Sequence, residues 1–253
     1  MFCLELILQP LSELLVRQVG KSNVQWFTYP FLPPTTFSGL LYSILVDEVE
    51  DGWRKNYVEV NDDALRQLSD RFPDAIPVGA YPLQTAWRRG SRHYRQHLGR
   101  DKFNYESFAF AGNKKLAIAE SLWTPYLRGF VLSHSSETLE RIRDDPRLLF
   151  RVIRVGKKGI IKVAQARLIQ LTLEQYEGFV STIVPLEMLM RLPEQIEIFH
   201  VPVRLDPATT LRWHIHPCLF GCEARGWCYK GDTDIAIPKR LLDLVSTVER
   251  QAG

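Results

Sequence analysis

The chain has 253 residues, of which 45% are hydrophobic and 24% charged, and its formal net charge is +3. These are ordinary values for a globular protein that is long enough to bury a core, and they exclude disordered, collagen-like and coiled-coil chains. No apolar run approaches the roughly 18 residues of a membrane span, and Met1–Leu6 carries an acid where a signal peptide is basic. We therefore expect a cytoplasmic protein without a cofactor, whose four cysteines are reduced.

The first predicted elements are a short strand and an amphipathic helix. Leu4–Gln9 has the apolar composition of a strand. A helix is predicted over Thr35–Glu48, because two prolines precede it and Thr35 can serve as its N-cap. Its apolar residues recur at helical spacing on one face, which consists of Phe37, Leu40, Leu41, Ile44 and Leu45.

A basic window follows at Thr85–Lys115, with eight Lys or Arg against two acids. Its arginines are interleaved with aromatic residues. Guanidinium groups pair with phosphates in a bidentate way, and aromatic rings stack on unpaired bases, so the window is predicted to bind single-stranded nucleic acid. The alternative is a solvated face in which aromatics such as Trp87, Phe108 and Phe110 belong to the core.

The middle of the chain predicts a strand, a helix and a pair of strands. They are a strand at Leu127–Ser133, a helix that begins after Ser135 or Ser136 and ends near Arg143, and strands at Leu148–Val155 and Ile160–Leu171. Together with the N-terminal strand and helix, this order predicts an α+β, ferredoxin-like unit, the layout that RNA-recognition domains also use.

The turn between the last two strands is the centre of a second basic window. Arg151–Arg167 holds six Lys or Arg and no acid, and the turn itself reads Gly156-Lys157-Lys158-Gly159. Glycines let backbone N–H groups approach a phosphate, and lysines add charge. The spacing is not that of a P-loop, and a tight turn that merely exposes two lysines explains the segment equally well. Two such concentrations of positive charge are typical of a polyanion site.

The remainder of the chain predicts a smaller, β-rich C-terminal unit. Strand-like runs lie at Phe179–Pro185, Ile196–Leu205 and Ile235–Ile237, and Leu241–Arg250 predicts a short final helix. We therefore expect two units, at residues 1–171 and 172–253.

Two sets of residues carry chemistry other than charge. His214, His216, Cys218 and Cys222 are zinc-ligating types, but they lack a CxxC pair, and we predict buried thiols and surface histidines instead of a metal site. The sequence has no GxSxG, HExxH or Walker motif. His93 and His97 leave open a metal-independent ribonuclease, since either could act as a general acid or base.

The segment Phe31-Leu32-Pro33-Pro34-Thr35-Thr36-Phe37-Ser38-Gly39-Leu40-Leu41 resembles a signature of the Cas-five family within the CRISPR-associated RAMP superfamily. An N-terminal strand precedes a proline-rich stretch and a helix of this kind in that family. The Gly156–Gly159 turn is similar to the glycine-rich loop of RAMP proteins. The resemblance follows the order of elements over roughly the first 170 residues, and its close match is the Pro-Pro-Thr-Thr segment.

This resemblance implies a non-catalytic subunit of a type I Cascade complex. Such a subunit holds the 5′ handle of the guide RNA (crRNA), abuts the backbone subunit, contacts the large subunit and supports recognition of target DNA in antiviral defence. It also implies a projecting thumb hairpin, which we place at about residues 80–118. Some family members are endoribonucleases with a Lys-His arrangement, but here Lys114-Lys115 is followed by Leu116. The remaining alternative is an RNA-binding adaptor outside CRISPR.

The predicted RNA-binding residues combine these windows with the start of the helix, whose free N–H groups and threonine hydroxyls can hold a phosphate. They are Thr35, Thr36, Trp87, Arg88, Arg89, Arg92, His93, Tyr94, Arg95, Arg100, Lys102, Lys114, Lys115, Arg154, Lys157, Lys158 and Lys162.

Overall fold

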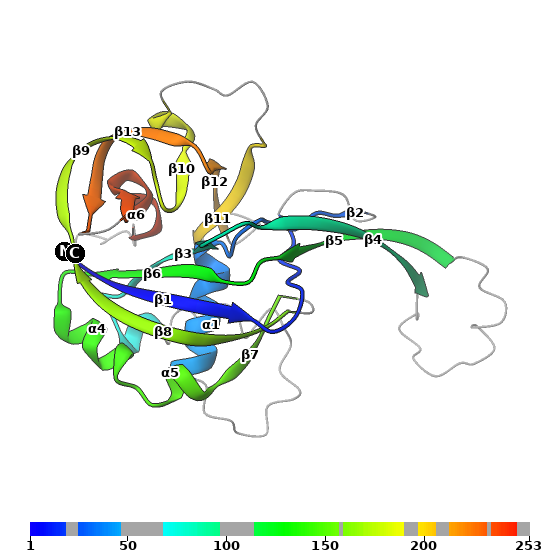
Figure 1. The fold of residues 1–253 in the computed structure, drawn as a ribbon, viewed down its shortest axis with the longest axis horizontal. Helices are drawn as coiled ribbons and strands as arrows, with labels where there is room; N and C mark the ends of the chain where they lie inside the picture. The colour runs from blue at the N-terminus through cyan, green and yellow to red at the C-terminus, as the bar shows by residue number, and fades with distance from the viewer. Residues whose placement is uncertain are drawn as a thin grey trace, which may run out of the picture.

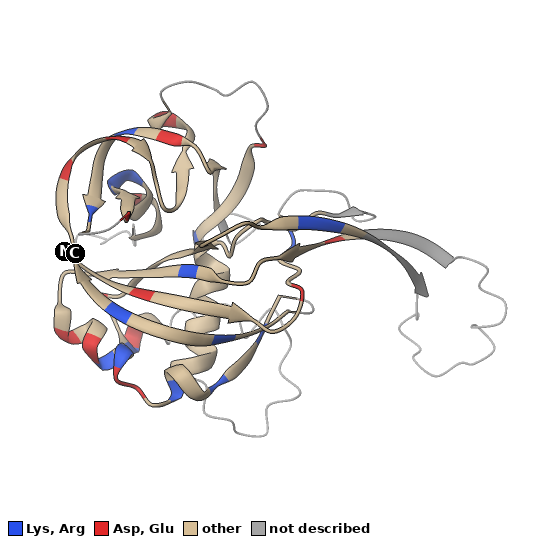
Figure 2. Ribbon diagram, in the orientation of Figure 1, with Lys and Arg blue, Asp and Glu red and all other residues tan. Residues whose placement is uncertain are grey.

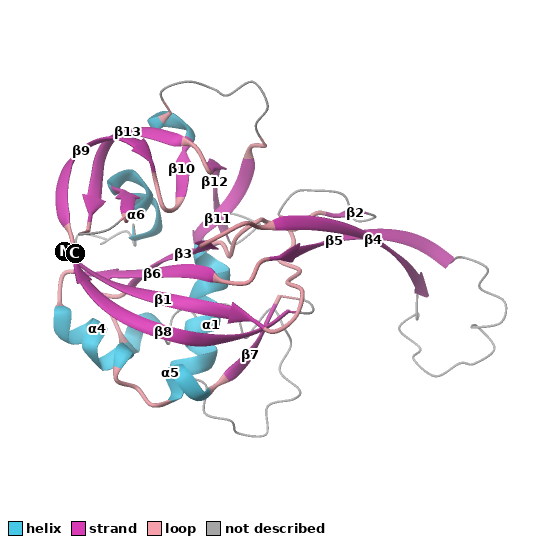
Figure 3. Ribbon diagram, viewed as in Figure 1, coloured by secondary structure: helices cyan, strands magenta, loops and turns pink. Residues whose placement is uncertain are grey.

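The computed structural model describes residues 1–18, 25–46, 68–96, 114–156, 159–189, 197–205, 213–231 and 234–246. Within these ranges the fold is mixed α and β and rich in sheet (Figure 3). A five-stranded sheet forms the centre, and three sheets of three strands adjoin it. No helix in the described ranges is both long and apolar enough to cross a membrane.

The central sheet is antiparallel at every neighbouring pair of strands. Its order is β3 (Ile76–Pro82), β6 (Leu127–Ser133), β1 (Phe2–Pro10), β8 (Gly159–Gln170) and β7 (Val152–Val155). Helix α1 (Pro34–Leu45) lies between β1 and β3 in the chain, and α4 (Ser136–Arg143) and α5 (Arg147–Phe150) lie between β6 and β7. Figure 1 shows these helices along the lower side of the sheet.

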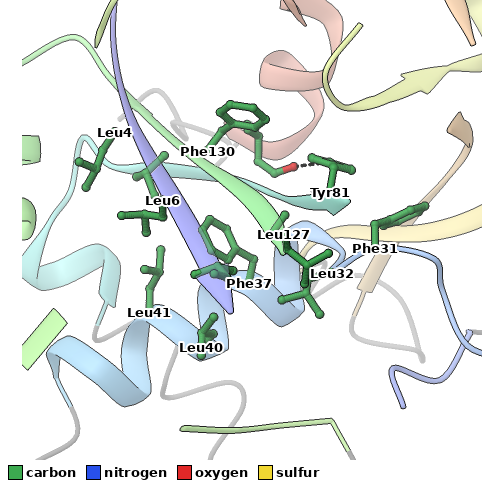
Figure 4. Close-up of a cluster of buried hydrophobic side chains, with 14 of the residues drawn as sticks. Leu4, Leu6, Phe31, Leu32, Phe37, Leu40, Leu41, Tyr81, Leu127 and Phe130 are labelled. Carbon is green, nitrogen blue, oxygen red and sulfur yellow. Dashed lines mark hydrogen bonds between the residues drawn. The ribbon is translucent and has the colours of Figure 1, made fainter. Parts of the chain in front are cut away.

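The main core lies between α1 and the sheet. The predicted apolar face of α1 is buried, and Figure 4 shows Leu4 and Leu6 of β1 facing it. Gly129 of β6 is required at this contact, because a Cβ there would lie 2.6 Å from the ring of Phe37. The helix therefore approaches the sheet closely, and its position fixes the proline-led segment that precedes it.

The C-terminal half forms two of the small sheets. One has the order β10 (Ile183–Pro185), β12 (Trp213–Phe220), β11 (Phe199–Leu205), and the other β14 (Ala236–Pro238), β13 (Glu223–Lys230), β9 (Thr172–Phe179). The single turn η1 (Leu186–Met188) and helix α6 (Lys239–Ser246) complete this half. The chain passes from β8 into β9 at the predicted boundary of residue 171, but one hydrophobic core spans both halves. For example, the centre of the Phe31 ring lies 5.4 Å from the ring centre of Phe199 and 5.5 Å from that of Phe220.

Two sequence predictions in the central sheet need correction. Leu148–Val155 is not one strand, because Asp145 accepts a hydrogen bond from the Arg147 backbone N–H (2.9 Å) and starts the helical turn α5, so that only Val152–Val155 is extended. Thr35 is not the N-cap of α1. Pro33 takes that position, and its carbonyl accepts the first helical hydrogen bond, from Phe37 N–H (2.9 Å).

The C-terminal strands also differ from the prediction at Phe179–Pro185. Phe179 ends β9, and a separate strand, β10, begins at Ile183. The side chains of β9 are mostly exposed, so it lacks the apolar pattern that marks a buried strand. Its pairing with β13 over its whole length is what holds it in the fold.

Candidate nucleic-acid interface

The first basic window forms a long hairpin that projects from the body of the protein. Strands β4 (Trp87–Gln96) and β5 (Lys114–Trp123) pair antiparallel from Trp87↔Trp123 to Gln96↔Lys114, and the short strand β2 (Gln25–Trp26) joins the sheet beside β5. Figure 1 shows this hairpin reaching out at the right end of the long axis. The two paired strands cover residues 87–96 and 114–123, and the thumb is predicted at about residues 80–118, of which 97–113 lie outside the described residues.

A pair of tryptophans lies at the root of the hairpin. Trp87 and Trp123 are direct cross-strand partners, with 55% and 39% of their surfaces exposed. Arg89, two residues along β4, is exposed on the same face, and it forms no ion pair with any described residue. Ser121, opposite Arg89, is buried and donates a hydrogen bond to Glu13 Oε2 (2.7 Å). An aromatic pair beside a cation offers both a stacking surface and a phosphate contact.

Trp123 is absent from the residues predicted from the sequence. The signal that would have found it is the strand register, since Trp123 lies 36 positions from Trp87 and becomes its neighbour only through the pairing of β4 with β5. The predicted aromatic contact at Trp87 therefore has a second exposed tryptophan as its cross-strand partner.

Arg88 lies on the opposite face of β4 and is already paired. Its Nη2 lies 2.5 Å from Glu197 Oε2 and its Nη1 3.7 Å from Glu120 Oε2, and its guanidinium stands 6.0 Å from the centre of the Phe199 ring. These contacts tie the hairpin to the C-terminal half of the chain. Because two carboxylates compensate its charge, the structure gives Arg88 an anchoring contact, and its predicted RNA contact stays a prediction.

The segment Leu11–Val16 joins the second basic window to the root of the hairpin. At one end the Leu11 backbone N–H donates to Ile160 O (2.8 Å), next to the turn between β7 and β8. Further along, Leu14 and Leu122 of β5 exchange two backbone hydrogen bonds (3.1 and 2.7 Å). The β7–β8 turn and the root of the hairpin therefore lie at the same end of the central sheet, and Figure 2 shows Lys and Arg on β4, β7 and β8 there.

The two glycines of the β7–β8 turn have a packing role. Gly156 has φ +61°, and a Cβ there would lie 2.3 Å from the Leu15 carbonyl oxygen. At Gly159 a Cβ would lie 2.5 Å from Leu14 Cδ2. The close backbone approach that these glycines permit is thus made to the Leu11–Val16 segment, and a phosphate contact by this turn stays a prediction.

The remaining predicted residues of the windows differ in what the structure describes. Arg92, His93, Tyr94 and Arg95 lie in β4, where their backbones pair with residues 115–118 of β5. Lys114 and Lys115 begin β5 at this same end, and Lys115 is the partner of Arg95. Arg154 is exposed on β7, and Lys162 is half-buried on β8. Outside the described residues lie His97, Arg100, Lys102, Lys157 and Lys158.

The start of α1 is enclosed by the fold. Phe31 to Pro34 are buried, and the Thr35 hydroxyl donates a hydrogen bond to the Pro202 carbonyl of β11 (3.2 Å). Thr36 is half-buried. The contacts made by this segment are therefore internal, and phosphate binding by Thr35 and Thr36 stays a prediction that these contacts do not favour.

The histidine and cysteine residues do not converge. Among the described residues, no three His, Cys, Asp or Glu side chains are placed to hold a metal ion. Cys218 and Cys222 are buried in different hydrophobic clusters, while His214 and His216 stack with their ring centres 6.4 Å apart. Burial raises the pKa of the Cys218 thiol, and it raises that of Cys222 to about 11. Burial thus favours the protonated form of both thiols.

His216 has a carboxylate partner in Glu187. The His216 Nε2 atom lies 3.0 Å from Glu187 Oε2, and Arg240 Nε donates to Glu187 Oε1 (2.7 Å). Partial burial acts to raise the pKa of Glu187, but the hydrogen bonds from Arg240 and His216 outweigh it and lower the pKa to about 2. The three residues stabilise the contact between η1, β12 and α6.

No protein-family model matches the sequence, and no curated protein matches it. Solved structures resemble the fold at low sequence identity. A crystal structure of a CRISPR protein from Archaeoglobus fulgidus is 13% identical with a TM-score of 0.49, and the alignment covers 93% of this chain and 98% of that one. A chain in a cryo-EM structure of the type III-B Cmr-beta complex, bound to cognate target RNA and AMPPnP, is 9% identical with a TM-score of 0.48, over 87% of this chain and 86% of that one.

Proposed function

We propose that this protein is an RNA-binding subunit of a CRISPR ribonucleoprotein complex. The observation that carries the proposal is the hairpin β4–β5, which projects from the sheet with an exposed tryptophan pair and Arg89 at its root. The second basic window lies at the same end of the molecule, because the Leu11–Val16 segment bonds to Ile160 in that window and to Leu122 at the root of the hairpin. Unpaired bases can stack on the tryptophans while cations compensate the phosphates, and each stacked base contributes on the order of 1–3 kcal/mol.

Within this class we propose a type I Cascade subunit of the Cas-five kind that holds the 5′ handle of the crRNA. The sequence resemblance of Phe31–Leu41 supports this choice. The element order β1, α1, β3, β6, α4, β8, with β1 between β6 and β8 and β3 at the edge, fits the ferredoxin-like domain of that superfamily. On this proposal the partners are the crRNA, the backbone and large subunits and, within the complex, target DNA.

We propose a scaffold without catalytic activity. The enzymatic alternative, maturation of precursor crRNA, would require a general acid or base near the RNA backbone, and its candidates are His93 and His97. An adaptor outside CRISPR would bind RNA without preference for a repeat sequence. Each of these alternatives predicts a different outcome of one binding and cleavage experiment.

The experiment incubates the full chain with repeat-derived RNA, and with an unrelated RNA of equal length, in EDTA. We expect salt-dependent binding that favours the repeat RNA, with no cleavage of either. A single defined cut that is lost in His93→Ala or His97→Ala would establish the nuclease instead. Equal affinity for both RNAs would favour the adaptor, and binding of neither RNA would reject RNA binding altogether.

A further inference from the structure

The outward face of the sheet formed by β9 and β13 exposes large apolar side chains at the end of the protein away from the hairpin. Four cross-strand pairs form this β9–β13 face: Leu173↔Tyr229, Gln175↔Trp227, Glu177↔Arg225 and Phe179↔Glu223. The intervening residues Ala224 and Cys228 are fully buried, so the side chains of these pairs point outward, except that Tyr229 is half-buried and packs against the main core. The exposed fractions are 64% for Phe179, 49% for Trp227 and 44% for Leu173.

The charges of the β9–β13 face do not suit a nucleic acid. Glu177 and Glu223 contribute two carboxylates, and the one cation among the four pairs, Arg225, lies 3.6 Å from Glu177. The face therefore has a net negative charge that repels phosphates. This distinguishes Trp227 and Phe179 from the tryptophan pair at the hairpin, which has Arg89 beside it.

The position of this face leaves the hairpin free. Figure 1 shows β9 and β13 at the left end of the long axis and the β4–β5 hairpin at the right end. A molecule that covers β9 and β13 consequently does not obstruct the two basic windows. A protein that holds RNA at one end can thus contact a neighbour with the other.

We propose that the β9–β13 face docks a second, different protein, which presents an apolar patch bordered by Lys or Arg. The apolar side chains on the face supply the centre of such an interface, and Glu177 and Glu223 supply its charged border. A second copy of this chain is a poorer occupant, because its own net negative face would oppose this one across a two-fold axis. This inference rests on the proposed function in one respect: the partner is expected to be another protein of the same RNA-containing complex.

The test isolates the native complex through a tagged full-length chain and compares Trp227→Ser with Trp87→Ser. Both residues are exposed tryptophans on strands, but they lie at opposite ends of the molecule. For Trp227→Ser we expect the amount of one partner protein per chain to fall about tenfold or more, as for an interface hot spot, while bound RNA stays unchanged. For Trp87→Ser we expect loss of RNA with the partner retained. Thermal melting of each variant reports whether it folds.

A photo-crosslinker placed at Phe179 identifies what covers the face. An adduct with another protein, within a peptide where apolar residues adjoin Lys or Arg, supports the proposal if Trp227→Ser also abolishes it. Adducts with a second copy of this chain or with RNA, or no adduct in the intact complex, would overturn it. So would equal loss of the partner in both tryptophan variants, because the partner would then be held through the RNA. Loss of RNA binding by the wild-type chain would reject the proposed function but leave the protein adduct as a separate result.

Discussion

The two adjacent arginines at the root of the hairpin provide a sharp test of the interface. Arg88 faces two carboxylates and an aromatic ring, whereas Arg89 is exposed on the face of the tryptophan pair. The perturbation is Arg89→Gln, which removes one positive charge and keeps the length of the side chain similar. Its matched control is Arg88→Gln, which removes the same charge one residue away.

The expected magnitude follows from counterion release. A cation that neutralises one phosphate of single-stranded nucleic acid contributes about 0.7 to the slope of log K against log salt. At about 0.1 M salt, Arg89→Gln should therefore weaken RNA binding about fivefold and make the slope shallower by about 0.7. Because Arg88 is already compensated, Arg88→Gln should leave the slope unchanged. It should instead lower the free energy of unfolding by about 0.2–1 kcal/mol, the contribution of a partly exposed ion pair.

The assay is fluorescence anisotropy with labelled repeat-derived RNA over a series of salt concentrations, together with denaturant unfolding of each variant. If Arg88→Gln reduced the salt slope and Arg89→Gln did not, the assignment of the two arginines to opposite roles would be refuted. An unchanged slope for both variants would remove the hairpin root from the interface.

Three further predictions concern packing, pH and thiol chemistry. Gly156→Ala should lower the free energy of unfolding by more than about 2 kcal/mol, because the strain of a positive φ adds to a collision with Leu15. The control Gly221→Ala, at a glycine with positive φ but open space, should lower it by only about 1–2 kcal/mol in the same denaturant titration. Equal losses in the two variants would contradict the packing role of Gly156. The pKa of Glu187 is about 2, below its ordinary value of 4.5, so its ionised form stabilises the fold above pH 4.5 and this stability is lost as the pH falls toward 2. The melting temperatures of wild type and Glu187→Gln should therefore converge as the pH falls over that range. Melting temperatures that stayed apart would contradict the ion-pair assignment. All four cysteines are buried and have raised pKa values, so a thiol reagent should react only slowly with the native protein. After denaturation the same reagent should titrate four thiols. A thiol that reacts fast in the native state would contradict this burial.

The sequence alone determined the elements whose signals are local. Ser135 caps α4 by accepting a hydrogen bond from Thr138 N–H, and that helix ends at Arg143 as predicted. The strand at Leu127–Ser133 has the predicted bounds, and the apolar face of α1 is buried as its spacing requires. These features depend on neighbours within about four residues, so composition and period suffice to predict them.

Only the tertiary structure decided which residues meet across long separations. It placed Trp123 beside Trp87, paired Arg88 with Glu197 and brought the Leu11–Val16 segment against both the root of the hairpin and the start of β8. It also assigned the glycines of the β7–β8 turn to packing against Leu14 and Leu15, which their sequence context does not reveal. The physical reason is that strand register and ion-pair partners depend on how distant segments pack, whereas charge and aromatic content are present in the sequence whether or not they are free to bind RNA.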